Sequence, residues 1–272
     1  MRFVAGITAL LAVPALLQAA NWGKDGLWSD GRAEVAVYDA EAMVDGKARA
    51  FKEHLITLRE EVRVAQKPVR TFKLNQVQNW ELENYPQSVL ASVVVKEDAV
   101  ERVVKMTVAT QDWNGNTIKS YNGDMEGNGG TLRWDVAGTT EAGSADIAVE
   151  REDYFEEQLP LSLRALPFKD GFEKNVRLFD AQTGKTGGAP MVTEATLNVA
   201  AGATVRGRVG SIPCWTVTIN RKGGKTDTYW FEKKYPNLLI KMETADGRKR
   251  MLAGRARWTF WDRRIPRPKV LN

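Results

Sequence analysis

Alternation of apolar and polar residues is the feature that most restricts how this chain can fold. Beyond the first twenty residues the dominant hydrophobic period is two, the period of a β-strand whose two faces meet different surroundings. Val104, Met106 and Val108, for example, alternate with Lys105 and Thr107. Antiparallel sheets provide one buried and one wet face, so the pattern predicts an all-β, mainly antiparallel protein.

The last third of the chain repeats this pattern between turns. The apolar positions are Trp215, Val217 and Ile219, then Leu238, Ile240 and Met242, then Ala256, Trp258 and Phe260. Turn residues separate the runs at Gly223-Gly224, Tyr235-Pro236-Asn237 and Asp246-Gly247. Residues 212–261 are therefore predicted to form a four-stranded meander.

A second hairpin is predicted near the start, where Asp45-Gly46 joins residues 32–44 to a run containing His54, Ile56 and Leu58. These three side chains share one side of the strand, and we expect that side to face the core or a cavity. A helix is predicted over residues 152–166, with an acidic start and an interruption at Pro160.

These elements predict one large, strongly curved sheet or half-open barrel built of meanders, with a short helix packed on it. The length of 272 residues suits a single domain. We expect that domain to cover residues 21–262, as two meander-like halves joined around the helix, followed by a basic tail at 263–272.

Residues 1–20 have the features of a cleaved signal peptide. Arg2 precedes an uncharged, mostly apolar stretch, and small residues follow at Ala19 and Ala20. The stretch is short for a membrane span, and no cysteine follows it that could carry a lipid anchor. The mature protein is therefore expected in the periplasm or outside the cell, without a transmembrane span.

Positive charge collects at the end of the chain. Residues 248–272 contain nine basic side chains and a single acid, Asp262. Such a segment can meet a lipid or an anionic envelope ligand, or contact a membrane surface peripherally, whereas nucleic acid is not expected in that compartment. The alternative interpretation is a solvated strand face followed by a disordered tail. The sequence does not identify a protein partner.

Groups for catalysis or metal binding are sparse. His54 is the single histidine and Cys214 the single cysteine. The acids between residues 150 and 157 would share one helix face, whereas glycan hydrolysis needs two carboxyls across a cleft. An oxygen-rich stretch at 124–135 resembles a calcium loop but lacks an entering helix. No catalytic residue, metal or cofactor is predicted.

Aromatic residues carry the remaining signal. The chain has nine tryptophans, several of them on or beside predicted strands. Core packing accounts for most of them, but aromatics on both faces of a sheet also suit a cavity for an apolar ligand. The candidate ligand-binding residues are Trp113, Asn114, Trp215, Trp230, Arg255, Arg257 and Trp258.

Several short blocks resemble an exported bacterial family of unknown function, some members of which are labelled septum formation inhibitor. The blocks are Leu74-Asn75, Asn84-Tyr85-Pro86, 111–117, Trp230-Phe231-Glu232, Tyr235-Pro236, 238–241, Asp246-Gly247-Arg248 and Trp258. The resemblance implies an envelope location and a curved antiparallel sheet similar to lipoprotein-carrier folds, and it brings no catalytic residues. Family members often have Cys where this chain has Asn114, so a thiol function there is not expected.

These observations favour a non-catalytic binding or scaffold protein for an apolar or amphipathic envelope ligand. In this hypothesis the cations from Arg248 onward meet an anionic head group. Two alternatives stay open: a hydrolase acting on envelope glycan or lipid, and a structural partner in a cell-envelope assembly that offers an exposed strand edge.

Overall fold

Fifteen strands form one continuous sheet in the computed structural model, which describes residues 22–24, 26–44, 46–81, 86–112, 115–124, 129–136, 142–150, 152–180 and 191–259. The strands are β1 (Arg32–Val44), β2 (Lys47–Val64), β3 (Lys67–Glu81), β4 (Pro86–Lys96), β5 (Val103–Asp112), β6 (Gly115–Gly123), β7 (Gly129–Asp135), β8 (Ala142–Ala148), β9 (Asp153–Phe155), β10 (Phe172–Asp180), β11 (Met191–Gly207), β12 (Gly210–Arg221), β13 (Thr226–Glu232), β14 (Leu239–Glu243) and β15 (Lys249–Thr259).

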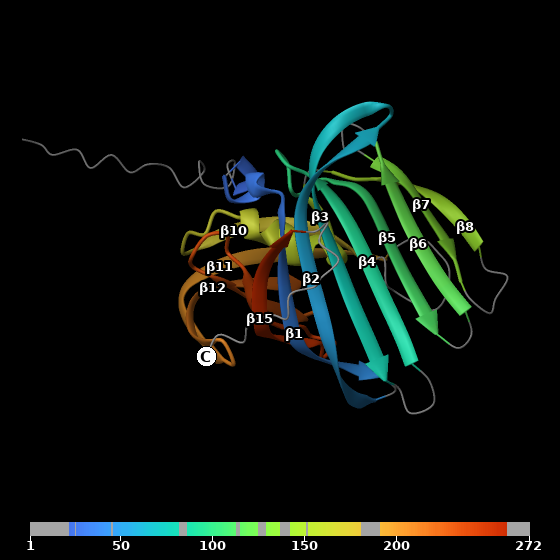
Figure 1. The fold of residues 1–272 in the computed structure, drawn as a ribbon. Helices are drawn as coiled ribbons and strands as arrows, with labels where there is room; N and C mark the ends of the chain where they lie inside the picture. The colour runs from blue at the N-terminus through green and yellow to red at the C-terminus, as the bar shows by residue number, and fades with distance from the viewer. Residues whose placement is uncertain are drawn as a thin grey trace, which may run out of the picture.

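The strand order is simple except at one place. Strands β1 to β8 form one consecutive series, strands β9 to β15 form another, and the two series join where β1 pairs with β15 (Figure 1). All neighbours are antiparallel apart from β9 and β10, which are parallel. The sheet does not close, because β8 and β9 are its two edges. The predicted single, mainly antiparallel curved sheet is confirmed.

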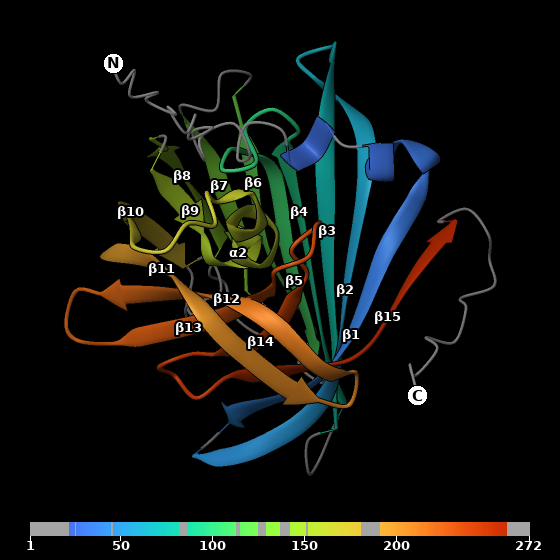
Figure 2. The ribbon, with the colours of Figure 1, turned by 90° about the vertical axis from the view of Figure 1, so that its left-hand side faces the viewer.

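The two series fold over one another. In Figure 2 the strands of the second half-sheet (β9–β15) run across those of the first half-sheet (β1–β8), with the helical segment between them. Buried side chains of both halves and of this segment form one core cluster, which includes Leu74, Met106, Leu161, Leu197 and Phe231. The interior is therefore bounded on its sides by a single sheet.

Both predicted meander elements are present. Strands β12 to β15 are consecutive antiparallel neighbours, as expected for residues 212–261. β1 and β2 form the predicted hairpin, where Gly46 takes a positive φ of 74° that suits glycine.

The predicted face of β2 is wrong. Glu53, Leu55 and Thr57 are buried, whereas His54 and Ile56 are half-buried on the other side of the strand. Leu58 is buried on that other side, but it is not part of the core cluster. Leu55 belongs to the core cluster, so His54 lies on the outer face of the sheet. Both faces of this strand contain apolar residues, and alternation alone does not say which of them faces inward.

The predicted short helix is present, but its bounds of 152–166 are wrong at the start and only four residues are α-helical. Asp153–Phe155 is the parallel edge strand β9, and a 3-10 turn (Glu156–Gln158), a four-residue α-helix, α2 (Leu159–Ser162), and a second 3-10 turn (Leu163–Ala165) follow. Pro160 stands in the first turn of α2, where its missing N–H costs no hydrogen bond. Over the described residues, no helix has the length and apolar character needed to cross a membrane.

Residues 22–30 cover one end of the interior. Two 3-10 turns, Trp22–Lys24 and Gly26–Asp30, place Trp22 and Trp28 against Phe72, with ring centroids 5.1 and 5.2 Å from the Phe72 ring. The Arg164 guanidinium lies 5.0 Å from the Trp22 ring and donates to both carboxylate oxygens of Glu34, at 2.7 and 3.0 Å. We call residues 22–30 the N-terminal cap.

Candidate functional site

A pocket of about 330 Å³ lies at the end of the interior away from the N-terminal cap. β1 starts beside the cap at Arg32 and reaches the pocket ten residues later, at Glu41–Met43. We call this cavity the basal pocket. Its lining residues are Glu41, Ala42, Met43, Phe51, Gln78, Trp80, Val89, Met242, Asp246, Arg248, Lys249 and Arg250.

Small side chains on β1 make room for the basal pocket. Ala40 stands opposite Phe51 of β2 on one side and opposite Arg250 of β15 on the other. Neighbouring strands are about 4.8 Å apart, so the walls contributed by β2 and β15 are roughly 10 Å apart at the backbone. Two alanines, Ala40 and Ala42, form the inner face of β1 at this point. Because their side chains are small, a slot is left between the two walls.

One wall of the slot is aromatic. The rings of Phe51 and Trp80 stack with centroids 4.1 Å apart and an interplanar angle of 14°. The Trp80 indole N–H donates to Gln78 Oε1 at 3.3 Å, which fixes the ring orientation. Val89 and Met242 add apolar surface. This wall can hold the apolar part of a ligand.

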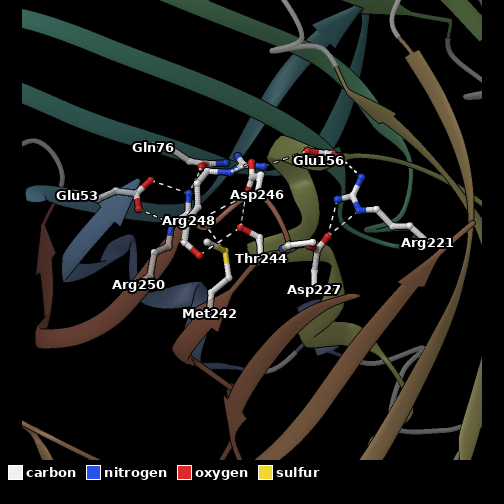
Figure 3. A network of polar contacts seen from close by, with 11 residues as sticks. Glu53, Gln76, Glu156, Arg221, Asp227, Met242, Thr244, Asp246, Arg248 and Arg250 are labelled. Carbon is white, nitrogen blue, oxygen red and sulfur yellow. Dashed lines mark hydrogen bonds and ion pairs between the residues drawn. The ribbon is translucent and has the colours of Figure 1, made fainter. Parts of the chain in front are cut away.

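The inner wall contains a buried ion pair. Arg250 forms two contacts with the Glu53 carboxylate, one from Nε and one from Nη2, the latter at 2.8 Å (Figure 3). Gln78 donates to Glu53 Oε1 at 2.8 Å, and Arg250 Nη2 also donates to Gln76 Oε1 at 3.3 Å. Glu53 is completely buried and Arg250 nearly so. The Arg250 charge is therefore already compensated inside the protein.

Two exposed ion pairs lie near the pocket, Lys249 with Glu41 on the outer face of β1 and β15 and Arg248 with Asp246 on the side of the pocket. Lys249 Nζ lies 3.1 Å from Glu41 Oε1, its direct neighbour across β1 and β15. Arg248 Nε lies 2.8 Å from Asp246 Oδ2. Partial burial alone would raise the pKa of Asp246, but Arg248 and the Thr244 hydroxyl together hold this pKa below its ordinary value. Asp246 is thus an anion at neutral pH.

The turn that carries Asp246 and Arg248 depends on a glycine. Gly247 has a φ of 87°, and a β-carbon at this position would lie 2.8 Å from Met43 Cγ. The turn therefore packs closely against Met43 of β1, and this contact sets the position of Asp246 and Arg248 at the mouth of the pocket.

Polar contacts continue inward from Arg248. Arg248 Nη2 lies 3.4 Å from Glu156 Oε2, while the other oxygen of Glu156 accepts from Arg221 Nη1 at 2.5 Å. Arg221 also donates to Asp227 Oδ2, at 2.5 and 2.8 Å (Figure 3). A cavity of about 20 Å³ lies among these groups, large enough for one water molecule. The network holds the turn segments of β14 and β15 against the helical segment.

A larger hollow of about 650 Å³ opens on β10–β12 and the residues before β9. Its charged side chains form exposed pairs, such as Lys222 with Glu194 at 2.9 Å and Arg177 with Glu150 at 3.2 Å. It has no aromatic lining residue. This surface therefore has no aromatic wall of the kind that Phe51 and Trp80 give the basal pocket.

The five predicted ligand-binding residues that the structure describes do not line the basal pocket. Trp113 and Asn114 lie outside the described residues. Trp215 packs on Phe168, with ring centroids 6.0 Å apart. Trp230 lies on the other face of its sheet, with Lys241 Nζ 4.5 Å from its ring centre. Trp258 is half-buried opposite Ala33, on the outer face of β15.

Arg255 and Arg257 lie on the inner side of β15, contrary to the predicted alternation. The pairing of β1 with β15 shifts between Val37 and Tyr38, and this irregularity reverses the side-chain order. Arg255 forms an ion pair with Glu232 at 2.5 Å, and Arg257 pairs with Asp30 of the N-terminal cap at 2.7 Å. Both arginines stabilise the end of the interior away from the basal pocket.

The other chemical candidates lie apart from the pocket. Burial raises the pKa of the Cys214 thiol to about 11, which makes it a poor nucleophile at neutral pH. Asp153 and Glu156 each pair with an arginine, Arg177 and Arg221. Among the described residues, no three His, Cys, Asp or Glu side chains gather in a group that could hold a metal ion.

Sequence reasoning missed Phe51, Trp80, Glu53 and Arg250. The signal that could have found Glu53 is an acid between apolar residues in a strand, paired with an arginine in another strand. These residues come from β2, β3 and β15, and Glu53 and Arg250 are 197 positions apart. Their meeting depends on the β1–β15 pairing.

No family model and no curated protein matches the sequence. Among solved structures, the fold is similar to a beta-barrel-like protein of the domain of unknown function DUF1849 from Brucella abortus, at 12% identity and a TM-score of 0.49, over 83% of this chain and 97% of that one. It is also similar to a DUF1089 family protein from Pseudomonas aeruginosa, at 12% identity and a TM-score of 0.39, over 68% of this chain and 87% of that one. Likenesses this distant carry no argument about the site.

Proposed function

We propose that this protein is a non-catalytic binding protein of the cell envelope that holds an apolar or amphipathic small ligand in the basal pocket. The observation that carries the proposal is the slot of about 330 Å³, with the stacked Phe51 and Trp80 rings on one side and charged groups at its mouth. Small-ligand sites commonly have volumes of about 300–1,000 Å³ and combine apolar walls with a few placed polar groups.

The walls of the slot favour an apolar group over water. Each methylene group that leaves water for an apolar wall contributes about 0.8 kcal/mol. Gln78 holds Trp80, and the Glu53–Arg250 pair fixes the inner wall, so little ordering is left to occur on binding. The pocket thus supports binding without any rearrangement of the sheet.

The envelope location is supported by the sequence of residues 1–20, which has the order of a cleaved signal peptide. If it is cleaved after Ala20, the protein recovered from a periplasmic fraction begins at Asn21. N-terminal sequencing of that protein tests the location, and an intact Met1 on a membrane-bound chain would contradict it.

A pocket-filling substitution tests binding. Ala42 lines the slot, whereas Ala50 is exposed on the opposite face of the neighbouring strand. Ala42→Met should weaken binding of the uncharged apolar dye N-phenyl-1-naphthylamine at least tenfold in a fluorescence titration, because the new side chain occupies the space of the ligand. Ala50→Met should leave the affinity unchanged.

A second variant covers the case in which Ala42→Met disturbs packing. Phe51→Leu keeps an apolar side chain but removes one ring of the aromatic wall, and it should weaken the dye about fivefold or more. Equal affinity of the wild type and both variants, all with native circular dichroism, would show that the dye binds elsewhere. A wild type that binds no dye would overturn the proposal.

A further inference from the structure

We infer that the ligand of the basal pocket is a compact, uncharged compound with one aromatic ring or two fused aromatic rings, rather than the acyl chain of a membrane lipid. This inference rests on the proposed function and narrows its class of ligand. The open face of one aromatic side chain, a polar band at the inner end of the pocket and the volume in front of that band support it.

The Phe51 ring has one covered and one open face. Trp80 of β3 stacks on one side of it, with ring centroids 4.1 Å apart and an interplanar angle of 14°. On its other side Phe51 stands opposite Ala40 of β1, whose methyl group is too small to cover a ring. Phe51 is accordingly only half-buried. A flat ring that enters the slot can stack on this open face, and such stacking adds affinity beyond the burial of area.

A band of buried polar side chains closes the pocket at its inner end. Gln78 of β3 lines the pocket, and Gln76 follows two residues further inward. Gln78 donates to Glu53, and Arg250 contacts both Glu53 and Gln76 (Figure 3). Gln76 in turn donates to the backbone carbonyl of Glu157 in the helical segment. An acyl chain that passed this band would leave buried polar groups without partners, which is costly, so the ligand ends there.

The space in front of this band suits a small molecule. The pocket has a volume of about 330 Å³. A water molecule takes about 30 Å³ in the liquid, and a protein cavity of about 150 Å³ holds benzene, so the pocket has room for roughly 11 to 13 non-hydrogen atoms. Two fused rings with one small substituent reach this number, whereas the acyl chains of membrane lipids exceed it. Behind the band the interior is filled by the core cluster, which begins on β3 with Leu74.

Each charged side chain that lines the pocket has an oppositely charged partner. The pairs are Arg250 with Glu53, Arg248 with Asp246, and Lys249 with Glu41 on the outer face of the sheet. An ionic ligand would therefore lose hydration without meeting an uncompensated charge, which is unfavourable. The ligand is uncharged, in place of the anionic head group that the basic end of the sequence suggests.

Two neutral ligands of the same carbon skeleton test the ring preference. 2-Naphthol is flat and aromatic, whereas decahydro-2-naphthol is its saturated, puckered counterpart. In isothermal titration calorimetry at pH 7, 2-naphthol should bind the mature wild-type protein at least about threefold more tightly, because the aromatic ring alone stacks on Phe51. Phe51→Leu should remove this preference. Phe168→Leu, the same change at a ring that does not line the pocket, should keep it. Equal affinity of the two ligands for the wild type would overturn the inference.

A series of n-alkanols tests the closed inner end of the pocket. Each methylene group that is buried raises the affinity about fourfold. The affinity should therefore rise steeply from hexanol to decanol and then change by less than about twofold from decanol to dodecanol. A steep rise that continues to dodecanol would contradict the inference, because the interior would then admit an acyl chain.

Charged naphthalenes test the absence of a charge on the ligand. Naphthalene-2-sulfonate and 2-naphthylmethylammonium carry the same fused rings as 2-naphthol, with a negative and a positive charge. Each should bind at least about tenfold more weakly than 2-naphthol. Binding of either ion as tight as that of 2-naphthol would show that the pocket selects a charged group.

The two proposals fail in different ways. The naphthyl group of N-phenyl-1-naphthylamine fits the pocket, and its phenyl ring then lies at the mouth. If this dye binds and Ala42→Met weakens its binding, but the saturated ring or the longer alkanols bind as well as an acyl site predicts, the pocket binds another class of apolar ligand and the inference alone fails. If neither the dye nor any of these ligands binds, the proposed function fails and the inference fails with it.

Discussion

The buried pair of Glu53 and Arg250 contributes to the structure through compensation of charge. Taking a carboxylate and a guanidinium out of water is costly, and the pair survives because each partner is also hydrogen-bonded, to Gln78 and to Gln76. Such a pair stabilises little in net terms, but loss of one partner leaves an uncompensated charge inside the protein. The pair therefore fixes the arrangement of side chains in the inner wall of the basal pocket, but it adds little to the stability of the protein.

Glu53→Gln should lower the free energy of unfolding by about 3–5 kcal/mol, because Arg250 is then buried without its carboxylate. The double variant Glu53→Leu with Arg250→Met should recover much of that loss, since it removes both charges. Urea unfolding followed by circular dichroism measures both effects. Glu41→Gln, which breaks an exposed ion pair, is the control and should cost no more than about 1 kcal/mol. Similar losses for Glu53→Gln and Glu41→Gln would contradict this account.

Single residues also show a limit of sequence reasoning. The alternation around His54 correctly predicts a strand, but it is symmetrical, and apolar side chains stand on both sides. The buried side is the one with Glu53 and Thr57, whose polarity argues against burial until their partners are known. Hydrogen bonds to distant strands decide which face of β2 is buried. A local sequence pattern contains no information about these bonds.

The N-terminal cap is a short element whose stability depends on packing. Trp28 is 2% exposed, and its ring lies between Trp22, Phe72 and the guanidinium groups of Arg164 and Arg257. Its indole N–H donates to the Tyr235 hydroxyl at 3.1 Å. The cap therefore links β3, the helical segment and the turn between β13 and β14.

Trp28→Ala should destabilise the protein by about 3–5 kcal/mol, the usual cost of removing a large buried ring. Trp230→Ala is a matched control, because that tryptophan is half-buried on the outer face and should cost clearly less. Thermal unfolding of the two variants in one buffer makes the comparison. A larger shift for Trp230→Ala would show that the cap is dispensable.

Some secondary-structure elements could be predicted correctly from the sequence, and others could not. The β12–β15 meander and the β1–β2 hairpin follow from alternation and turn residues, since both are local signals. The helix over 152–166 was overestimated, because Asp153–Phe155 pairs in parallel with β10, a contact that local periodicity does not report. The shift in β15 that turns Arg255 and Arg257 inward also depends on the neighbouring strand.

The described strands form one open sheet whose two halves are joined by aromatic side chains. Tyr121 of β6 lies 4.8 Å from Phe155 of β9, and Phe155 lies 5.4 Å from Phe179 of β10, measured between ring centroids. Burial of the Tyr121 ring raises the pKa of its hydroxyl to about 12, with smaller contributions from Asp124 and Asp153. Aromatic packing thus connects the two half-sheets on the side opposite the β1–β15 pairing.

Hydrogen exchange should reveal this open edge. β8 pairs only with β7, whereas β3 is hydrogen-bonded on both sides, by β2 and β4. Amides of β8 should therefore exchange by local opening, at least about a hundredfold faster than those of β3, which need opening of much of the first half-sheet. Mass spectrometry of peptic peptides measures both strands together. Equal protection would show that another segment covers β8.

The overall architecture could be predicted from the sequence, whereas the pocket could not. A curved antiparallel sheet needs only the strand pattern and the turns. The basal pocket needs the register between β1 and β15, which sets Ala40 between Phe51 and Arg250. The local sequence does not encode that register. The described candidate tryptophans, Trp215, Trp230 and Trp258, therefore lie outside the basal pocket.

The pairing of β1 with β15 also has a consequence for the order in which the protein is made. Lys249 and Glu41, neighbours across this pairing, are 208 residues apart in sequence. A ribosome has to synthesise nearly the whole domain before β1 finds its second neighbour, and contacts so distant in sequence form slowly. A nascent chain that stops before β15 would hold two half-sheets with unpaired inner edges, so the domain gains its interior only when the last described strand is complete.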